Sequence, residues 1–149
     1  MIKRVLIIGS AIIACVVMWW LISPLWRTVV RNEPPPQPAQ KTAETAASAV
    51  VAQAAMVASA HDVKGRALLL ETDGQKIVRF EDLETINGPD LRIYLSAGLD
   101  ANDFVDLGPI RATRDNVNYP VPPDTDTSKY RHVLIWCRAF GVLFSYAAL

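Results

Sequence analysis

The residue in this sequence best suited to chemistry is Cys137, which lies in the stretch HVLIWCRAF near the C-terminal end. The other of the two cysteines, Cys15, lies in an apolar N-terminal run, so no disulfide is expected inside the folded domain. An unpaired thiol in an oxidising compartment favours intermolecular disulfide exchange or another redox use. The alternative is that Cys137 is a small apolar core residue, as free cysteines often are. The residues alone leave both interpretations open.

Two aromatic residues accompany Cys137 and are candidate neighbours of a redox site. Trp136 directly precedes it, and Phe140 follows it by three positions. Strand alternation predicts that Cys137 shares one face with Val133 and Ile135, while Trp136 points to the other face. Because apolar residues occupy both faces, this strand is expected in the centre of a sheet. A reactive cysteine needs access and thiolate character, and the sequence indicates neither.

No enzyme signature accompanies the cysteine. The sequence lacks a G-x-S-x-G elbow, a phosphate loop, a G-x-G-x-x-G motif and a C-x-x-C motif. Its two histidines, His61 and His132, stand at the two ends of the β-rich part and predict no metal site. The acidic stretch from Asp100 has Val105 and Arg111 where a calcium loop needs Gly and Glu. We therefore expect no independent enzyme activity, predict no metal and assign no cofactor.

The elements that position Cys137 are predicted to be short strands. From residue 61 onward, apolar runs alternate with turn signals every eight to twelve residues, which is typical of a small antiparallel β-sandwich. Asp73 and Gly74 form a strong hairpin signal between 63–71 and 76–80. Further strands are predicted over 91–96, 103–108, 132–137 and 141–146, with edge-type chain over the proline-containing segment 116–124.

The N-terminal part predicts a membrane anchor. Residues 5–26 carry no charge, and a helix of that length spans about 30 Å, the thickness of a bilayer's hydrocarbon core. Trp19, Trp20 and Trp26 cluster at its far end, where indole rings favour the headgroup region. A signal anchor with the N-terminus inside exports the rest of the chain. A lipoprotein signal, with Cys15 of IIAC as the lipidated residue, is the other interpretation.

Between anchor and sandwich we expect a spacer. The proline-rich segment 32–40 is predicted to be extended and semi-rigid, lifting the domain away from the bilayer. The alanine-rich segment 41–60 has high helix propensity and is predicted to be a helical or partly helical stalk. The expected organisation is therefore a tail (1–4), a transmembrane signal anchor (5–26), a Pro-rich and Ala-rich linker (27–60) and a β-sandwich domain (61–149).

Charge excludes one class of partner. Residues 61–149 hold ten Lys and Arg against thirteen Asp and Glu, a net of about −3. Nucleic-acid binding requires a basic face, so we predict no nucleic-acid partner. The expected partners are membrane lipid, through residues 5–26, and a redox protein.

The sequence also resembles the DM-13 domain family over about 61–149. The resemblance rests on NGPDLRIYLS, on LGPI, and on NYPVPPDTDTSKYRHVLIWCRAFGVLFSYAAL. It implies a β-sandwich with a single family cysteine, matched by Cys137, which is proposed to pass electrons, with haem carried only by partner domains. The chain departs from the family pattern at Ser145, where glycine is usual, and at Asp115 and Asn116, which replace a glycine turn.

Two functional hypotheses follow. The first is a single-pass, membrane-tethered module outside the cytoplasm with a redox or electron-transfer role through Cys137. The alternative is a non-catalytic binding or adhesion module, in which the turns NGPD (87–90) and PPDTDTS (122–128) make the contacts and Cys137 only packs.

Overall fold

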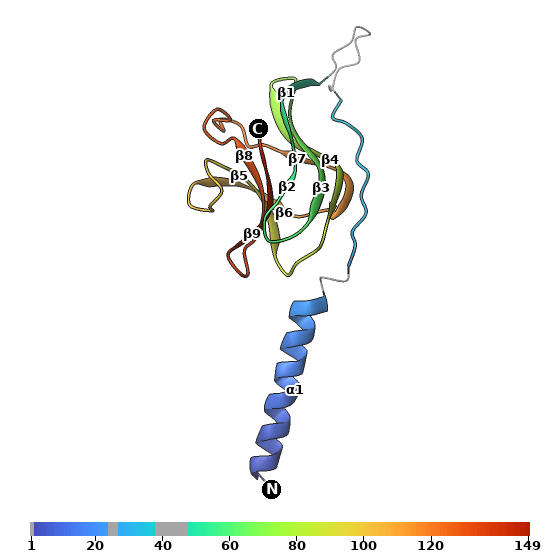
Figure 1. Cartoon of the computed structure of the whole chain (residues 1–149), viewed down its shortest axis with the longest axis vertical. Helices are drawn as coiled ribbons and strands as arrows, with labels where there is room; N and C mark the ends of the chain where they lie inside the picture. The colour runs from blue at the N-terminus through green and yellow to red at the C-terminus, as the bar shows by residue number, and fades with distance from the viewer. Residues whose placement is uncertain (1, 24–26, 38–47) are drawn as a thin grey trace.

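A computed structural model describes residues 2–23, 27–37 and 48–149. Figure 1 shows one helix, α1 (Ile2–Ile22), beside a sandwich of two β-sheets. The first sheet has the order β1 (Ala49–Ala55), β3 (Val63–Thr72), β4 (Gln75–Thr85) and β7 (Arg114–Pro120). The second has the order β2 (Val57–Ala58), β9 (Val142–Ala148), β8 (His132–Cys137), β5 (Leu91–Ser96) and β6 (Phe104–Pro109). The predicted antiparallel β-sandwich is confirmed.

The hairpin between β3 and β4 follows the turn chemistry of its sequence. Asp73 and Gly74 both have positive φ angles, 50° and 75°, and Thr72 pairs with Gln75 across the turn. Two successive positive φ angles match the right-handed twist of the flanking strands, and the Asp-Gly pair tolerates them. The predicted hairpin is confirmed.

The strand that carries the cysteine is central, as predicted. β8 pairs with β5 on one side and with β9 on the other. Val133, Ile135 and Cys137 are fully buried on the inner face, within the apolar core shared by both sheets. A strand that is apolar on both faces avoids water only in this position, which explains its place in the sheet.

The alanine-rich segment is not a helical stalk over the residues that the structure describes. Residues 49–58 form β1 and β2, which pair with β3 and β9 respectively. Ala52 and Ala54 of β1 are partly buried and pack against the apolar core. Tertiary pairing therefore overrides helix propensity. The sandwich begins before residue 61, while 41–47 lie outside the described residues.

Part of the proline-rich segment packs along the edge of the sandwich. Residues 27–37, which we call the N-terminal arm, run along β7 and extend the first sheet; Figure 1 shows them beside the sandwich. Val30 forms a parallel bridge with Arg114, and the Glu33 amide donates to the carbonyl of Asn116 at 2.9 Å. Over residues 27–37 the predicted linker is therefore hydrogen-bonded to the sandwich along β7.

Side chains of the sandwich complete the hydrogen bonding of the arm where proline cannot. Proline has no N–H, so a proline-rich edge strand can offer mainly its carbonyls. Arg79 donates to the Glu33 carbonyl at 3.1 Å, Asn118 to the Pro34 carbonyl at 2.9 Å, and Ser48 to the Pro36 carbonyl at 2.7 Å. The arm thereby covers the edge of β7, which would otherwise expose unpaired backbone groups.

The helix presents an apolar surface. Trp19 and Trp20 are 75% and 64% exposed, and the other exposed large hydrophobics of α1 are Ile8, Ile12, Ile13, Val16, Val17, Met18 and Ile22. Cys15 is also exposed, whereas Trp26 lies outside the described residues. Within the described part of the chain, no helix combines the length and apolar character needed to cross a membrane.

Candidate functional site

Cys137 is the last residue of β8 and is completely buried. Its neighbours across the sheet are Leu91 on β5 and Val142 on β9, so its thiol lies among apolar side chains. Attack on a disulfide needs a cysteine that its partner can reach, and the buried Cys137 thiol offers no such access. In its resting arrangement the thiol is therefore a core residue.

Although Cys137 is buried, it lies directly before the exposed turn that follows β8. Residues 138–141 are all exposed, and they connect β8 directly to β9. The turn is held by a 3.3 Å hydrogen bond from the Phe140 amide to the Cys137 carbonyl. Exposed turns with few packed side chains open at lower free energy than central strands. Lifting this turn is the shortest route by which Cys137 could reach a partner.

The two predicted neighbours of Cys137 lie near it along the chain but do not cover the thiol. Trp136 points to the outer face of the second sheet, because adjacent residues of a strand face opposite sides. The Phe140 side chain is 59% exposed at the tip of the turn. Neither aromatic ring therefore seals the thiol.

Trp136 instead belongs to an aromatic row that the sequence analysis did not predict. Its ring stacks with Tyr94 at 6.5 Å between centroids, and Tyr94 stacks on Phe104 at 4.1 Å. These residues come from β8, β5 and β6, which lie side by side. The alternation of LRIYLS, which places Tyr94 opposite to Leu91, Ile93 and Leu95, is the signal that could have indicated it.

Two ion pairs border the aromatic row. Arg92 contacts Asp106 at 2.8 Å, and Arg138 contacts Asp90 at 2.7 Å. Burial raises the pKa of Tyr94, and the Asp106 carboxylate adds to the effect. Tyr94 therefore stays protonated near neutral pH.

The histidines lie apart. The His61 ring packs on Phe144 at 4.1 Å, and His132 begins β8, at the opposite end of the strand from Cys137. Among the described residues, no three His, Cys, Asp or Glu side chains cluster in a way that could hold a metal ion. In the acidic stretch, Asp103 pairs with Lys129 at 2.8 Å, and this hydrogen bond lowers the Asp103 pKa.

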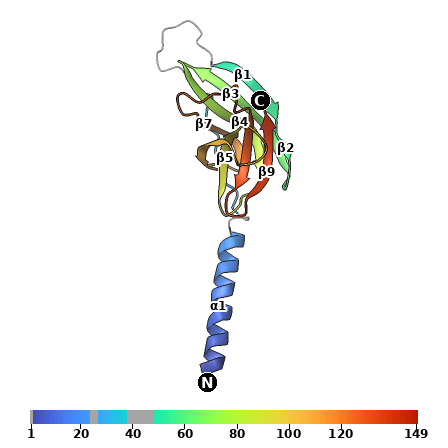
Figure 2. The ribbon, with the colours of Figure 1, turned by 90° about the vertical axis from the view of Figure 1, so that its left-hand side faces the viewer.

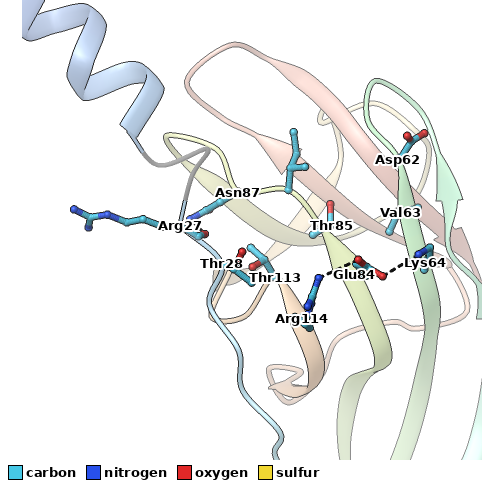
Figure 3. A pocket seen from close by; sticks show the side chains of 11 residues that line it. Arg27, Thr28, Asp62, Val63, Lys64, Glu84, Thr85, Asn87, Thr113 and Arg114 are labelled. Atoms are coloured by element: carbon cyan, nitrogen blue, oxygen red, sulfur yellow. Dashed lines mark hydrogen bonds and ion pairs between the residues drawn. The ribbon is translucent and has the colours of Figure 1, made fainter.

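A pocket of about 370 Å³ opens where the arm meets the sandwich, and we call it the arm pocket (Figure 3). It is lined by Arg27, Thr28, Asp62, Val63, Lys64, Glu84, Thr85, Ile86, Asn87, Thr113 and Arg114. Glu84 contacts both Lys64 and Arg114 at 3.0 Å, and the hydrogen bond from Lys64 is the main cause of its lowered pKa. The buried hydroxyl of Thr85 has no hydrogen-bond partner among the described atoms.

The family model described as "Electron transfer DM13" matches residues 55–149. This chain belongs to the DM13 family. The DM13 match begins at the last residue of β1 and includes both partners of β8. The arm and most of β1, which complete the first sheet, precede it. No curated protein and no solved structure is significantly similar to the chain.

Proposed function

We propose that this DM13 chain is an electron-transfer module, tethered to a membrane by α1 and working outside the cytoplasm through Cys137. The observation that carries the proposal is the match to an electron-transfer family over the region that holds the only cysteine of the sandwich. A fold match alone does not assign a function, so the chemistry must be compatible with the surroundings of that thiol.

Thiol–disulfide exchange is the chemistry that fits. In the open form, the Cys137 thiol loses its proton to solvent and its thiolate attacks one sulfur of a partner disulfide. The partner's S–S bond breaks, a mixed disulfide forms and the second partner sulfur leaves as a thiolate. A glutathione thiolate then attacks the Cys137 sulfur of the mixed disulfide, which releases the first partner as a dithiol and leaves Cys137 as its glutathione adduct. A second glutathione thiolate attacks the glutathione sulfur of this adduct, frees Cys137 and forms oxidised glutathione. Overall the partner disulfide gains two electrons, and two glutathione thiols are oxidised to one disulfide.

Opening of the turn at 138–141 controls this exchange in the proposal. The thiol is completely buried at rest, which protects it from irreversible oxidation. Because Cys137 is the terminal residue of β8, exposing it requires loss of its pairing with Leu91 and Val142 but leaves the rest of the strand paired. Reactivity is then proportional to the population of the open turn.

The membrane tether rests on the apolar N-terminal sequence and on the exposed side chains of α1. A helix that is apolar on all sides is stable in water only when it is covered, and lipid is the simplest cover for a single helix. The uncharged run of residues 5–26 has the corresponding length. Export of the sandwich would place Cys137 in an oxidising compartment, where its exchange partners occur.

The second candidate function is a binding module in which Cys137 only packs. The complete burial of the thiol favours it. The turn PPDTDTS borders a hollow of about 480 Å³ together with the β3–β4 hairpin, which offers a ligand-sized surface. The turn NGPD lies at the other end, where Asn87 contacts the arm.

Mixed-disulfide formation with oxidised glutathione tests the first proposal against the second. The full-length chain with Cys15→Ser is incubated in membrane-mimetic nanodiscs, and the adduct on Cys137 is followed by mass spectrometry under native conditions. The matched control also carries Cys137→Ala. We expect a slow adduct on Cys137 whose rate rises when Gly141, which has φ 63° in the turn, is replaced by Val.

Two results would decide against the redox role. One is an adduct that forms only at denaturant concentrations that unfold the sandwich, with the same midpoint. The other is a rate that does not respond to Gly141→Val although the variant remains folded. Either result would leave the binding module as the better hypothesis.

A further inference from the structure

Three segments of the sandwich meet at its end nearest α1, and we call them together the anchor-end surface. They are the start of the arm (27–28), the β4–β5 connection (86–90) and the β8–β9 turn (138–141). Figures 1 and 2 agree that the connection and the turn lie at the end where α1 is found, while the C-terminus lies at the other end.

Hydrogen bonds join these three segments. The side-chain amide of Asn87 donates to the Arg27 carbonyl at 3.3 Å, which links the connection to the arm. Arg138 donates through its backbone to the Asp90 carbonyl at 2.9 Å and through its side chain to the Asp90 carboxylate at 2.7 Å. The β8–β9 turn next to Cys137 is therefore hydrogen-bonded to the β4–β5 connection, which is itself hydrogen-bonded to the start of the arm.

The docked arm keeps this surface close to the end of the helix. Only four residues, 23–26, separate Ile22, where α1 ends, from Arg27, which is already bound to the sandwich. The five steps from Ile22 to Arg27 span at most about 17 Å when fully extended. The headgroup layer on each side of a bilayer is about 5–8 Å thick. A helix embedded up to its tryptophans would therefore hold the anchor-end surface within reach of the headgroups.

Two large apolar side chains are exposed on this surface and come from different segments. Phe140 is 59% exposed at the tip of the turn, and Ile86 is 41% exposed in the connection. Two exposed arginines lie near them. Arg138 precedes Phe140 by two residues, and Arg27 accepts a hydrogen bond from Asn87, which follows Ile86. Apolar tips flanked by arginine suit an interface where apolar groups and phosphates lie within a few ångströms of each other.

The arm pocket opens on the same end of the sandwich and adds polar groups to it. Ile86, Asn87 and Arg27 belong both to the pocket lining and to the anchor-end surface. In Figure 3, Arg27 points away from the sandwich, while Lys64, Glu84 and Arg114 lie in a row across the strands. The three cations of the pocket lining, Arg27, Lys64 and Arg114, outnumber its two carboxylates, Asp62 and Glu84, so a net positive charge remains to attract a lipid phosphate.

We propose that the anchor-end surface rests on the bilayer that holds α1, with Phe140 and Ile86 inserted among the headgroups and the arm pocket facing lipid phosphates. The inference rests on the proposed membrane tether. It places the turn above Cys137 at the membrane surface, so the exchange partner of this thiol is a protein embedded in the same bilayer. A freely diffusing protein would find the turn covered, whereas a small disulfide such as oxidised glutathione would still reach it.

Depth-dependent quenching of a single fluorophore tests the contact. The full-length chain with Cys15→Ser and Cys137→Ala receives one added cysteine, Ala139→Cys beside Phe140, which carries an environment-sensitive NBD label in phosphatidylcholine nanodiscs. The matched control is Gln75→Cys, an exposed position at the opposite end of β4. Nanodiscs with nitroxide-labelled headgroups should quench most of the fluorescence at position 139 and little at 75. Phe140→Ser should abolish most of the difference.

The outcomes separate this inference from the tether itself. If alkaline carbonate extracts the unlabelled chain from membranes, the tether fails. If the chain remains membrane-bound but the label at 139 is quenched no more than the label at 75, the tether stands and the bilayer contact is overturned. A label at 139 that is shielded from water but insensitive to the lipid quencher would show contact with another protein copy, and would also overturn the inference.

Discussion

The backbone amide of Asn118 donates a 2.9 Å hydrogen bond to the carboxylate of Glu33, 85 positions earlier in the chain. This contact makes a proline-rich segment part of the first sheet. Arg111 and Arg31 approach the same carboxylate at 3.4 and 3.3 Å. Glu33 is therefore the main side chain that fixes the arm to β7, and its loss should affect the arm more than the core.

Replacing Glu33 with Ala should release the arm. The substitution leaves the Asn118 amide without its acceptor and removes the partner of two guanidinium groups, a loss of about 1–3 kcal/mol of docking free energy. Hydrogen exchange at the amides of Arg31 and Glu33, measured by mass spectrometry, should accelerate. Glu71→Ala, an exposed glutamate on β3, is the control and should leave arm exchange unchanged. Equal exchange in both variants would contradict the role of Glu33.

Arm docking should also weaken at acid pH. Burial opposes ionisation of Glu33, but the Asn118 amide and the Arg111 and Arg31 side chains outweigh it and lower the Glu33 pKa. A lowered folded-state pKa gives stability that is complete above the ordinary glutamate pKa of about 4.3 and is lost as the pH falls through the folded-state value. Exchange of arm amides, relative to amides of β8, should rise in that window.

Glu33→Gln serves as the control for the acid effect. Glutamine keeps a carbonyl acceptor for the Asn118 amide but has no proton to gain. Its arm exchange, again relative to β8, should be faster than that of the parent chain at neutral pH and should lack the acid-dependent step. A step of equal size in this variant would assign the titration to another carboxylate.

The sequence predicted the parts of the fold that local chemistry determines. The Asp73-Gly74 turn, the central position of β8 and the shared face of Cys137, Val133 and Ile135 all follow from turn geometry and strand alternation. The positive φ angle of 74° at Asp115 likewise fits the replacement of a glycine turn. These features depend on residues close together in the chain.

The sequence failed where distant residues decide the outcome. Nothing in NEPPPQPAQ indicates that Arg79 and Asn118 donate to its carbonyls. Nothing in the alanine-rich segment indicates pairing with β3, since alanine favours helix in the absence of a sheet edge. The same limit hid the aromatic row, whose members come from three strands. Only the tertiary structure brings such partners together.

Cys137→Ser should destabilise the sandwich more than Cys137→Ala. Serine places a hydroxyl in an apolar, fully buried site, at a cost of about 1–3 kcal/mol when it has no partner. Alanine leaves only a small cavity, with a cost of about 1 kcal/mol. Denaturant unfolding of both variants in the Cys15→Ser background checks the order. A reversed order would indicate that a polar group or water reaches the thiol.

Gly65→Ala should be one of the most damaging single substitutions in the first sheet. Gly65 has φ 101°, and a Cβ there would lie 2.5 Å from the carbonyl oxygen of Glu81, across the irregular pairing of β3 and β4. The clash is with backbone, so we expect a loss of about 2–4 kcal/mol of stability. Gly74→Ala, with φ 75° but nothing within 4 Å, should cost only about 1 kcal/mol. Similar unfolding midpoints for the two variants would refute the steric argument.

Ser145→Ala should leave stability unchanged or raise it by about 1 kcal/mol, although the residue is completely buried. The Ser145 hydroxyl has no hydrogen-bond partner among the described atoms, so alanine removes only an unsatisfied polar group. Ser96 is the matched control, because it is equally buried but bonds to the carbonyls of Asp100 and Asp103. Ser96→Ala should therefore cost about 1–3 kcal/mol, since the loop loses the single O–H donor shared by these carbonyls and the acceptor of the Gly98 amide. Thermal unfolding of both variants checks the contrast. A loss at Ser145 as large as at Ser96 would mean that the Ser145 hydroxyl binds an internal water or a partner group.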